Sequence, residues 1–434
     1  MSIIQHTPAG IMVKWKTICY DRDMRLDVLG ILFSSAVFLV INRWGLGILH
    51  TEVFLAGLTL ISMCYLLVSM LRPTRSLHLR IFLTIVFAVV ATILPTVTNM
   101  QERHRTLPQN FVNDSAMQAE IAGRYILLGL NPYSTPYDKS DLAKWPYIDE
   151  MGNKTNPALF NNIHPPFLLL VSAAQYRIFA QLFAWSDIRV VYLLAYASLF
   201  ILAFWKFGVS EKLLLFLIFG ALNPLLMTFI PEGTNDVMVL AILLWTLFAA
   251  EKKSYIVAGI LLGLAIGTKQ TAWVAAPFLV YSFWRNQPAK AFRQFIVSAS
   301  LTTLVIYIPF LVWHVEALIK SLVLYVTTDP RAQKFIHPIE GIGFSPVLPK
   351  LGIVKSLYST FPFWIIQIIA YTISILVYWF TTKRGAKEER NVLFFMAFGT
   401  LMAWYFSRYF LQSHLGYIIT LFTFSYFWDQ KKIT

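Results

Sequence analysis

The stretch from Phe111 to Tyr133, FVNDSAMQAEIAGRYILLGLNPY, is a polar interruption between two apolar segments, and it carries a helical pattern of its own. Asn113 or Asp114 can serve as the N-cap, because short polar side chains accept hydrogen bonds from the first free amides of a helix. Apolar residues then recur at helical spacing, at Met117, Ile121, Tyr125 and Leu128. The pattern predicts a short juxtamembrane helix with its apolar stripe on the membrane surface.

The polar face of this predicted helix bears Glu120 and Arg124, four positions apart, and we expect both to face water. Asp114 stands at the head of the helix and is the candidate general base, since a carboxylate near cations stays ionised and can take a proton from a hydroxyl. Helix capping alone would also account for Asp114. Glu120, Asp138 and Asp141, in the same loop, are the alternative bases.

The composition indicates a membrane protein. Of 434 residues, 57% are hydrophobic and 13% are charged, and many apolar runs approach the roughly 20 residues needed to cross a bilayer. The net charge of +14 comes largely from Lys and Arg in short connections, as membrane orientation alone produces, and this argues against nucleic-acid binding. Cys19 and Cys64 predict neither a disulfide framework nor a metal site. The sequence therefore predicts an all-α, polytopic transmembrane helical bundle.

Basic residues orient the predicted spans. We expect a cytoplasmic tail at 1–25, two N-terminal spans within 26–80 and one membrane unit over 81–434. The outer loops of that unit are 99–163 and 314–362, and the turn from Arg408 to His414 lies on the same extracytoplasmic face. About 12 spans follow from this assignment, with both termini inside.

Two segments depart from a simple succession of spans. The apolar run 254–284 is too long for one helix, so we divide it at Thr268-Lys269-Gln270 into a hairpin of two short helices with Lys269 at the outer tip. The segment 167–184 is then expected to be re-entrant or interfacial.

Charged and imidazole side chains gather at the predicted outer ends of the spans, and charges near membrane depth tend to be functional. The candidates for binding a phosphate or another part of a substrate are Glu120, His164, Asp236, Lys269, Arg331, His337, Arg408 and His414. Each type also has a structural interpretation: lysine can snorkel to the interface, arginine can orient loops, and Glu232 with Asp236 can cap a helix start. The histidines have no metal-ligand spacing. No cofactor is predicted. A divalent metal is compatible with these residues but not required, because fixed Lys and Arg side chains can stabilise negative charge in the same way.

Four stretches in order resemble the integral-membrane glycosyltransferases of the type C fold (GT-C). They are NDSAMQAEIAGRYILLGLNPY at 113–133, HPPF at 164–167, GTND at 233–236 and AGILLGLAIGTKQ at 258–270. Within that fold the chain is most similar to the prokaryotic polyprenyl-phosphate-mannose-dependent mannosyltransferases. The resemblance runs from about Ile81 to His414.

The resemblance implies a polyprenyl-phosphate sugar donor, a lipid or glycan acceptor glycosylated at the extracytoplasmic face of the plasma membrane, and inversion at the sugar carbon. Asp114 matches the family's base, His164 to Pro166 match its H/Y-P-P element, and Lys269 matches the lysine after its AGxxxGLA run. Many relatives carry an aromatic pair shortly after the loop aspartate, where this chain has Met117 and Gln118.

Two other classes of protein are alternatives. A lipid or sugar transporter or flippase would show internal symmetry and ionisable residues near mid-span, whereas here the charges gather at span ends and no internal repeat is seen. A structural subunit would need no acidic residue at the head of the loop helix. The sequence therefore favours a membrane glycosyltransferase that moves a hexose such as mannose.

Overall fold

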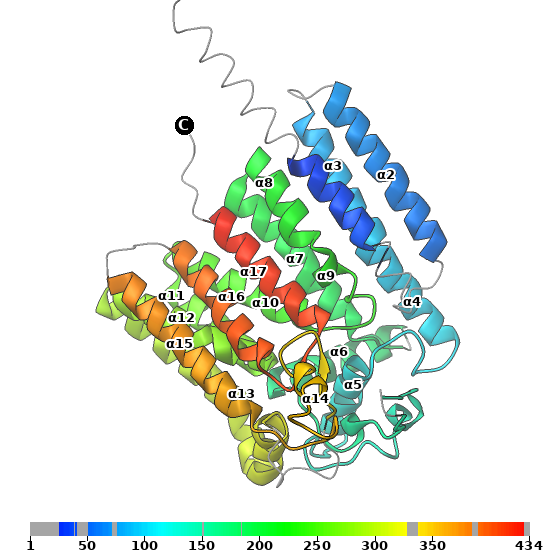
Figure 1. The fold of residues 1–434 in the computed structure, drawn as a ribbon, viewed down its shortest axis with the longest axis vertical. Helices are drawn as coiled ribbons and strands as arrows, with labels where there is room; N and C mark the ends of the chain where they lie inside the picture. Colours follow the sequence, from blue (N-terminus) through cyan, green and yellow to red (C-terminus); the bar gives the residue numbers. More distant parts are fainter. Residues whose placement is uncertain are drawn as a thin grey trace, which may run out of the picture.

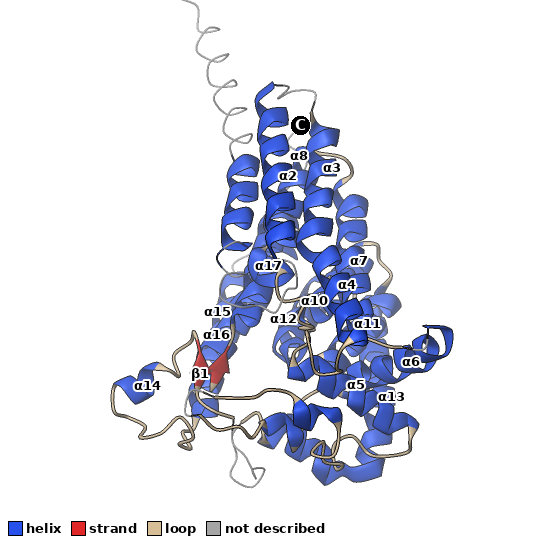
Figure 2. Ribbon diagram, turned by 90° about the vertical axis from the view of Figure 1, so that its right-hand side faces the viewer, coloured by secondary structure: helices blue, strands red, loops and turns tan. Residues whose placement is uncertain are grey.

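The computed structural model describes residues 26–38, 40, 51–71, 76–149, 152–183, 185–327, 337–383 and 389–428. The expected cytoplasmic tail at 1–25 and the candidate Arg331 lie outside them. Within these residues nearly all regular structure is helical, which confirms the all-α prediction. Figures 1 and 2 show the helices bundled together, with the long loops gathered at one end.

The helices in chain order are Leu26–Phe38, α2 (Thr51–Leu71), α3 (Leu77–Ala88), α4 (Leu94–Arg105), α5 (Asp114–Leu127), α6 (Pro166–Phe183), α7 (Arg189–Phe207), α8 (Glu211–Phe216), α9 (Pro224–Met227), α10 (Asp236–Glu251), α11 (Tyr255–Thr268), α12 (Gln270–Asn286), α13 (Ala289–Ile319), α14 (Val347–Lys350), α15 (Phe363–Lys383), α16 (Glu389–Tyr405) and α17 (Gln412–Trp428). Shorter turns are the π-helical η1 (Val89–Ile93), η4 (Leu217–Ala221) and η5 (Lys320–Leu324) and the 3-10 η2 (Asp141–Lys144) and η3 (Pro157–Leu159). Six helical stretches in the described chain are long and apolar enough to cross a bilayer, and others are shorter. This supports a multi-pass membrane protein, while the count of about 12 spans stays a prediction.

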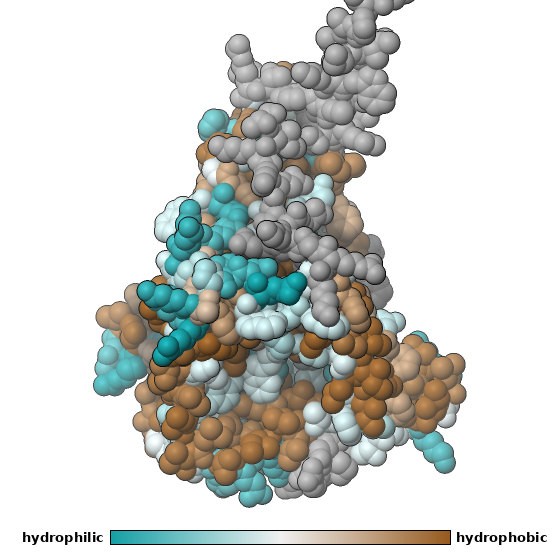
Figure 3. All heavy atoms as spheres, turned by 90° about the vertical axis from the view of Figure 1, so that its left-hand side faces the viewer, coloured by the Kyte–Doolittle hydropathy of each residue, from teal (hydrophilic) through white to brown (hydrophobic). Residues whose placement is uncertain are grey.

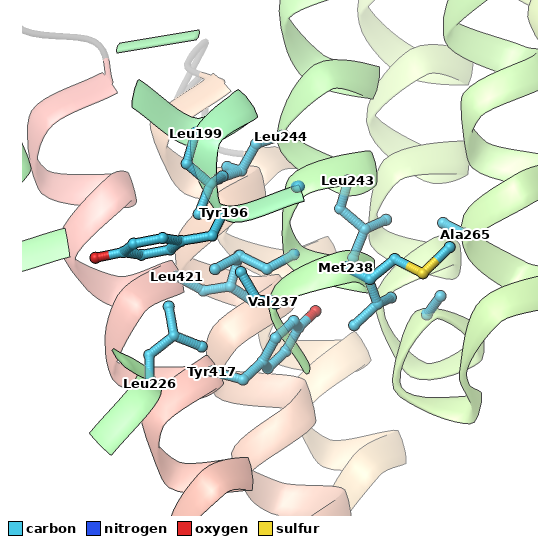
Figure 4. Packing of buried hydrophobic residues seen from close by; sticks show 14 of the residues in the cluster. Tyr196, Leu199, Leu226, Val237, Met238, Leu243, Leu244, Ala265, Tyr417 and Leu421 are labelled. Carbon is cyan, nitrogen blue, oxygen red and sulfur yellow. The ribbon is translucent and has the colours of Figure 1, made fainter. Parts of the chain in front are cut away.

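Helix α10 lies in the core of the bundle. Its sequence, DVMVLAILLWTLFAAE, has no polar stripe, and a helix that is apolar all round is stable only when neighbours cover every side. Helices α7, α11 and α17 supply that cover. Figure 4 shows Val237 and Met238 of α10 packed among Tyr196 of α7, Ala265 of α11 and Tyr417 of α17. The first residue of α10, Asp236, is thereby held at a defined place.

The expected break at Lys269 is confirmed. Lys269 is extended (φ −158°, ψ 146°), α11 ends before it and α12 begins after it. The two helices pack mainly against different partners, α11 on α13 and α12 on α16. Glycines in the AGILLG run permit the first contact, because a Cβ added at Gly259 would lie 1.9 Å from Ser298 Oγ and one at Gly263 would lie 2.8 Å from the Ala299 carbonyl oxygen.

Helix α6 contradicts the re-entrant alternative for 167–184, while the interfacial alternative stays a prediction. It is an uninterrupted helix, Pro166–Phe183, and by length and composition it is a candidate span with no re-entrant break. It packs along α5 so closely that a Cβ at Gly123 would lie 2.7 Å from the Ala173 nitrogen. The apolar residues Met117 and Ile121 of α5 are therefore buried in protein, so the expectation that they lie on the membrane surface is wrong.

The segment 314–362, which was expected to be an outer loop, begins as a helix, and its later part pairs with the turn between α16 and α17. Helix α13 changes direction at His314 but continues to Ile319, and η5 follows it. Further on, β1 (Glu340–Gly341) pairs in parallel with β2 (Tyr409–Phe410). The turn between α16 and α17 thus anchors the described part of this loop.

The N-terminal helices join the rest of the bundle through buried charges. Arg80 Nη1 lies 2.7 Å from Asp27 Oδ2, Arg80 also pairs with Glu211 of α8, and the Tyr65 hydroxyl donates to Asp27. The expected division after residue 80 falls inside α3 (Leu77–Ala88). We retain a two-part organisation as a proposal, with its boundary moved to before Leu77.

Candidate active site

A polar pocket of ≈ 320 Å³ lies where the loops converge. Its walls come from the start of α5, the stretch before α6, the turn before α10, the break at Lys269 and the turn before α17. Segments that the sequence assigned to separate outer loops thus share one cavity. Six predicted site residues line it: Asp114, His164, Asp236, Lys269, His337 and His414.

Asp114 occupies the first turn of α5 but does not cap that helix. The N-cap is Asn113, whose side chain accepts a hydrogen bond of 2.7 Å from the Ala116 amide. The Asp114 carboxylate faces the pocket instead, where its Oδ2 accepts from Asn156 Nδ2 at 2.8 Å. Because Asn113 caps the helix, the Asp114 carboxylate is available to a substrate.

Lys269 is ion-paired in the pocket wall. Its Nζ lies 2.6 Å from Asp236 Oδ1, and the side chains of Lys269 and Asp236 are 16% and 2% exposed. Lys269 was expected at the outer tip of a hairpin, and its ammonium there turns inward to a buried carboxylate, since an unpaired charge at that depth would be costly. Next to it, Gln270 donates to the Ile163 carbonyl oxygen at 2.7 Å and ties the break to the segment before α6.

His164 is buried and neutral. Its Nε2, assigned here as the protonated nitrogen, donates to the Ser115 carbonyl oxygen at 2.9 Å, and Tyr133 donates to the His164 carbonyl oxygen at 2.7 Å. Burial lowers the pKa of His164 to about 4. The imidazole therefore helps to hold the start of α5 and is uncharged at neutral pH.

Two further histidines that line the pocket stack on aromatic rings. His337 stacks on Tyr409 with ring centroids 4.6 Å apart, and His414 stacks on Trp404 at 4.4 Å. Burial lowers the pKa of His337. These flat surfaces are suited to covering the apolar face of a sugar ring.

Arg408, a predicted phosphate ligand, does not line this pocket. Its guanidinium donates to three backbone carbonyl oxygens, those of His337, Leu357 (2.8 Å) and Ser359 (2.8 Å). Burial lowers the pKa of Arg408 to about 10. In this structure the residue holds the 337–362 segment in place, so any effect on a bound phosphate is indirect.

Glu120 does not face water as expected. It is 7% exposed and forms a bidentate pair with Arg103, whose Nη1 and Nη2 lie 3.0 and 2.7 Å from its two oxygens. Arg103 Nη1 also lies 2.9 Å from Asp187, and Glu120 accepts from the Ile188 amide. Arg103 belongs to α4, and Asp187 and Ile188 precede α7, so partners from two other segments take the place of water around Glu120.

Arg189 is a residue that sequence reasoning missed. It is fully buried, pairs with Asp187, and donates from one nitrogen to the carbonyl oxygens of Phe111 (2.6 Å) and Pro231 (2.7 Å). It therefore joins the turn before α5 to the turn before α10, the two that carry the acidic pocket residues. A charge directly before an apolar span was the available signal.

Other pocket residues carried no usable sequence signal. Asn156, Tyr147 and Tyr325 come from irregular segments or a helix end, with no motif around them. Glu232 also lines the pocket; its sequence context offered it both as a charge at an outer span end and, with Asp236, as a helix cap.

The pocket holds groups that can bind an anion as well as carboxyl groups that oppose one. Helices α5, α10, α12 and α17 all begin at its wall, and helix N-termini carry partial positive charge and free amides. Lys269 adds an ammonium group, which is paired with the Asp236 carboxylate. Among the described residues, no group of three or more His, Cys, Asp or Glu side chains is placed to hold a metal ion.

The fold and pocket define a class: a polytopic helical membrane protein with a carboxylate and a lysine in a polar cavity at its loop-rich end. Residues 121–285 match the family model described as alpha-(1->6)-mannopyranosyltransferase, N-terminal domain. The match runs from the middle of α5 through most of α12, includes His164, Asp236 and Lys269, and begins after Asp114. It confirms the resemblance to GT-C mannosyltransferases and supports glycosyltransferase activity of the mannosyltransferase kind. Comparisons with curated proteins and with solved structures found no match.

Proposed function

We propose that this protein transfers mannose from a polyprenyl-phosphate carrier to an acceptor hydroxyl at the extracytoplasmic membrane face, with inversion. The observation that carries the proposal is the shared pocket of Asp114, whose carboxylate accepts a hydrogen bond from Asn156, and of Lys269 with the N-termini of four helices. A lipid-linked sugar needs both, a base for the acceptor and positive charge for the leaving phosphate.

In the proposed reaction Asp114 takes the proton of the acceptor hydroxyl. The acceptor oxygen forms a bond to the anomeric carbon from one side, and the bond from that carbon to the phosphate oxygen breaks on the other, so the configuration inverts. Polyprenyl phosphate leaves with the electron pair. Lys269 and the converging helix N-termini stabilise the charge that develops on that oxygen.

An apolar groove beside the pocket suits the carrier chain. It has a volume of ≈ 730 Å³, lies between α11, α12 and α13, and includes Ile266 and Trp273 on either side of Lys269. The Trp273 indole donates to the Ile266 carbonyl oxygen at 2.8 Å, which leaves apolar surface to the groove. Figure 3 shows the face of the molecule on the side of α11, α12 and α15, where a hollow lies among largely apolar side chains. A polyprenyl chain here would bring its phosphate toward Lys269.

Charge at the far end of the bundle supports the proposed orientation. Helix α10 runs from Asp236, in the pocket, over 16 residues or about 24 Å to Glu251 at the opposite end. Basic residues mark the short connections at that end: Lys206, Lys212, Lys252, Lys253 and Arg285. By the positive-inside rule that end faces the cytoplasm, so the pocket faces outward.

The test is mannose transfer from polyprenyl-phosphate mannose in reconstituted membranes. Asp114→Asn should lower turnover by about 100-fold or more, since it removes the basic oxygen and keeps the shape. Asp138→Asn is the matched control: it lies exposed in the same loop and away from the pocket, and it should retain activity. Equal activity of Asp114→Asn and wild type would contradict the assignment of the base.

A further inference from the structure

Glu232 lies in the pocket beside the proposed base, on a turn that is firmly held. The Asn113 amide donates to the Glu232 carbonyl oxygen at 2.8 Å, and Arg189 grips the preceding residue, Pro231, at 2.7 Å. The next residue, Gly233, has φ +103°, and a Cβ there would lie 2.7 Å from the Ala116 Cβ. The backbone of Glu232 is thus fixed against the first turn of α5.

The charges of the pocket do not balance if every carboxyl group is ionised. Three carboxyl groups line it, those of Asp114, Glu232 and Asp236, against one lysine, Lys269, and no arginine. Lys269 is already paired with Asp236, and Glu232 forms no ion pair with a Lys or Arg side chain in the described part of the chain. A third carboxylate would oppose an anionic donor, whereas a neutral carboxylic acid would not.

Burial raises the pKa of Glu232 to about 8. Burial also keeps His164 and His337 neutral at that pH and raises the pKa of Tyr147, Tyr325 and Tyr409. The titratable and charged groups that face this turn or line the pocket with it are Asp114, Tyr147, His164, Arg189, Asp236, Lys269, Tyr325, His337, Tyr409 and His414. None of them is a cause of the shift at Glu232, which arises from desolvation.

We propose that Glu232 acts as a neutral carboxylic acid that donates a hydrogen bond to a phosphate oxygen of the donor lipid, opposite the positive charge of Lys269. This rests on the proposed function and adds a residue to the phosphate site. A protonated carboxyl group is a donor, whereas a carboxylate only accepts. Donor binding therefore weakens as pH rises through the titration of Glu232.

The test compares wild type with Glu232→Gln and Glu232→Ala between pH 6.5 and 9.5. Binding of polyprenyl-phosphate mannose is measured by the shift it causes in thermal unfolding, and KM by transfer. The donor is a phosphodiester, so its own charge is constant over this range. Wild-type affinity should fall by up to about tenfold per pH unit above pH ~8. Glu232→Gln, which keeps an N–H donor, should match wild type at pH 7 and show no such fall. Glu232→Ala should bind roughly 10-fold to 100-fold more weakly throughout.

Two results would overturn the inference. One is a folded Glu232→Gln protein that binds donor as poorly as Glu232→Ala, because that would mean a carboxylate is needed. The other is an alkaline loss of affinity that persists in Glu232→Gln. If wild type binds the donor with the expected pH dependence but transfers no sugar, the proposed function fails and the assignment of Glu232 stands.

Thermal unfolding of the protein without donor lipid tests the raised pKa of Glu232 independently of enzyme activity. The folded-state pKa of Glu232 exceeds that of the unfolded chain, so the folded state holds more protons between pH ~4.5 and ~8. This contribution to stability is present at low pH and is lost as pH rises to about 8. Glu232→Gln should remove that part of the slope, and an unchanged slope would contradict a raised pKa.

Discussion

Replacing Lys269 with alanine should first destabilise the protein, because Lys269 is the partner of a buried charge. Asp236 is 2% exposed, and its Oδ1 lies 2.6 Å from the Lys269 ammonium. Leaving a buried carboxylate without its partner costs about 3–5 kcal/mol. Typical domains have a total stability of about 5–15 kcal/mol, so Lys269→Ala should express poorly or unfold at a clearly lower temperature.

A double-mutant cycle separates this effect from catalysis. Asp236→Asn alone should cost less, since Lys269, at 16% exposed, can turn its ammonium toward the water of the pocket. The double variant Lys269→Ala with Asp236→Asn has no unpaired charge and should recover much of the loss, with a coupling of about 2 kcal/mol.

The assay is thermal unfolding in detergent together with mannose transfer. The double variant should be folded yet transfer roughly 100-fold or more slowly, because the leaving phosphate has lost its cation. Wild-type stability in the single Lys269→Ala variant would refute the energetic reasoning. Wild-type turnover in the double variant would refute the role of Lys269 at the phosphate.

Two further predictions concern charges that the structure places outside the pocket. Arg408→Lys should speed proteolysis within 337–362 while the helices stay intact. An ammonium cannot reach the three carbonyl oxygens that the guanidinium binds, so about 2 kcal/mol of hydrogen bonding is lost. An unchanged cleavage rate would count against this role of Arg408. Glu120→Gln should lower the free energy of unfolding by about 3 kcal/mol, because it removes one negative charge from the buried cluster around Arg103. The measurement is the unfolding temperature, with the exposed Asp138→Asn as control. Equal stability of the two variants would argue against a structural role for Glu120.

Much of the local structure was predictable because it depends on short-range patterns. The helix at 114–127, its start at Asn113 or Asp114 and the break at Lys269 were all visible as periodicity, a capping residue and the length limit of a span, and the structure shows that Asn113 is the cap. The clustering of polar segments was also expected from the distribution of basic residues. Six of the predicted site residues share a cavity, although their chemical roles remain proposals.

The sequence by itself determined the class of fold and pointed to six of the residues that line the pocket, since apolar periodicity and charge position are local properties. Only the tertiary structure decided which charges meet. The helical pattern that predicted a water-exposed Glu120 also allows its side chain to be buried, because Arg103 and Asp187, from other parts of the sequence, form a cluster of ion pairs with it. Arg408 binds backbone carbonyl oxygens, and Glu232 lines the pocket. In both cases contacts between segments that are distant in the sequence decide where the side chain lies. A helical pattern defines the face on which a side chain lies, but the neighbour that covers that face, and with it the charge state, depends on contacts made in the folded chain.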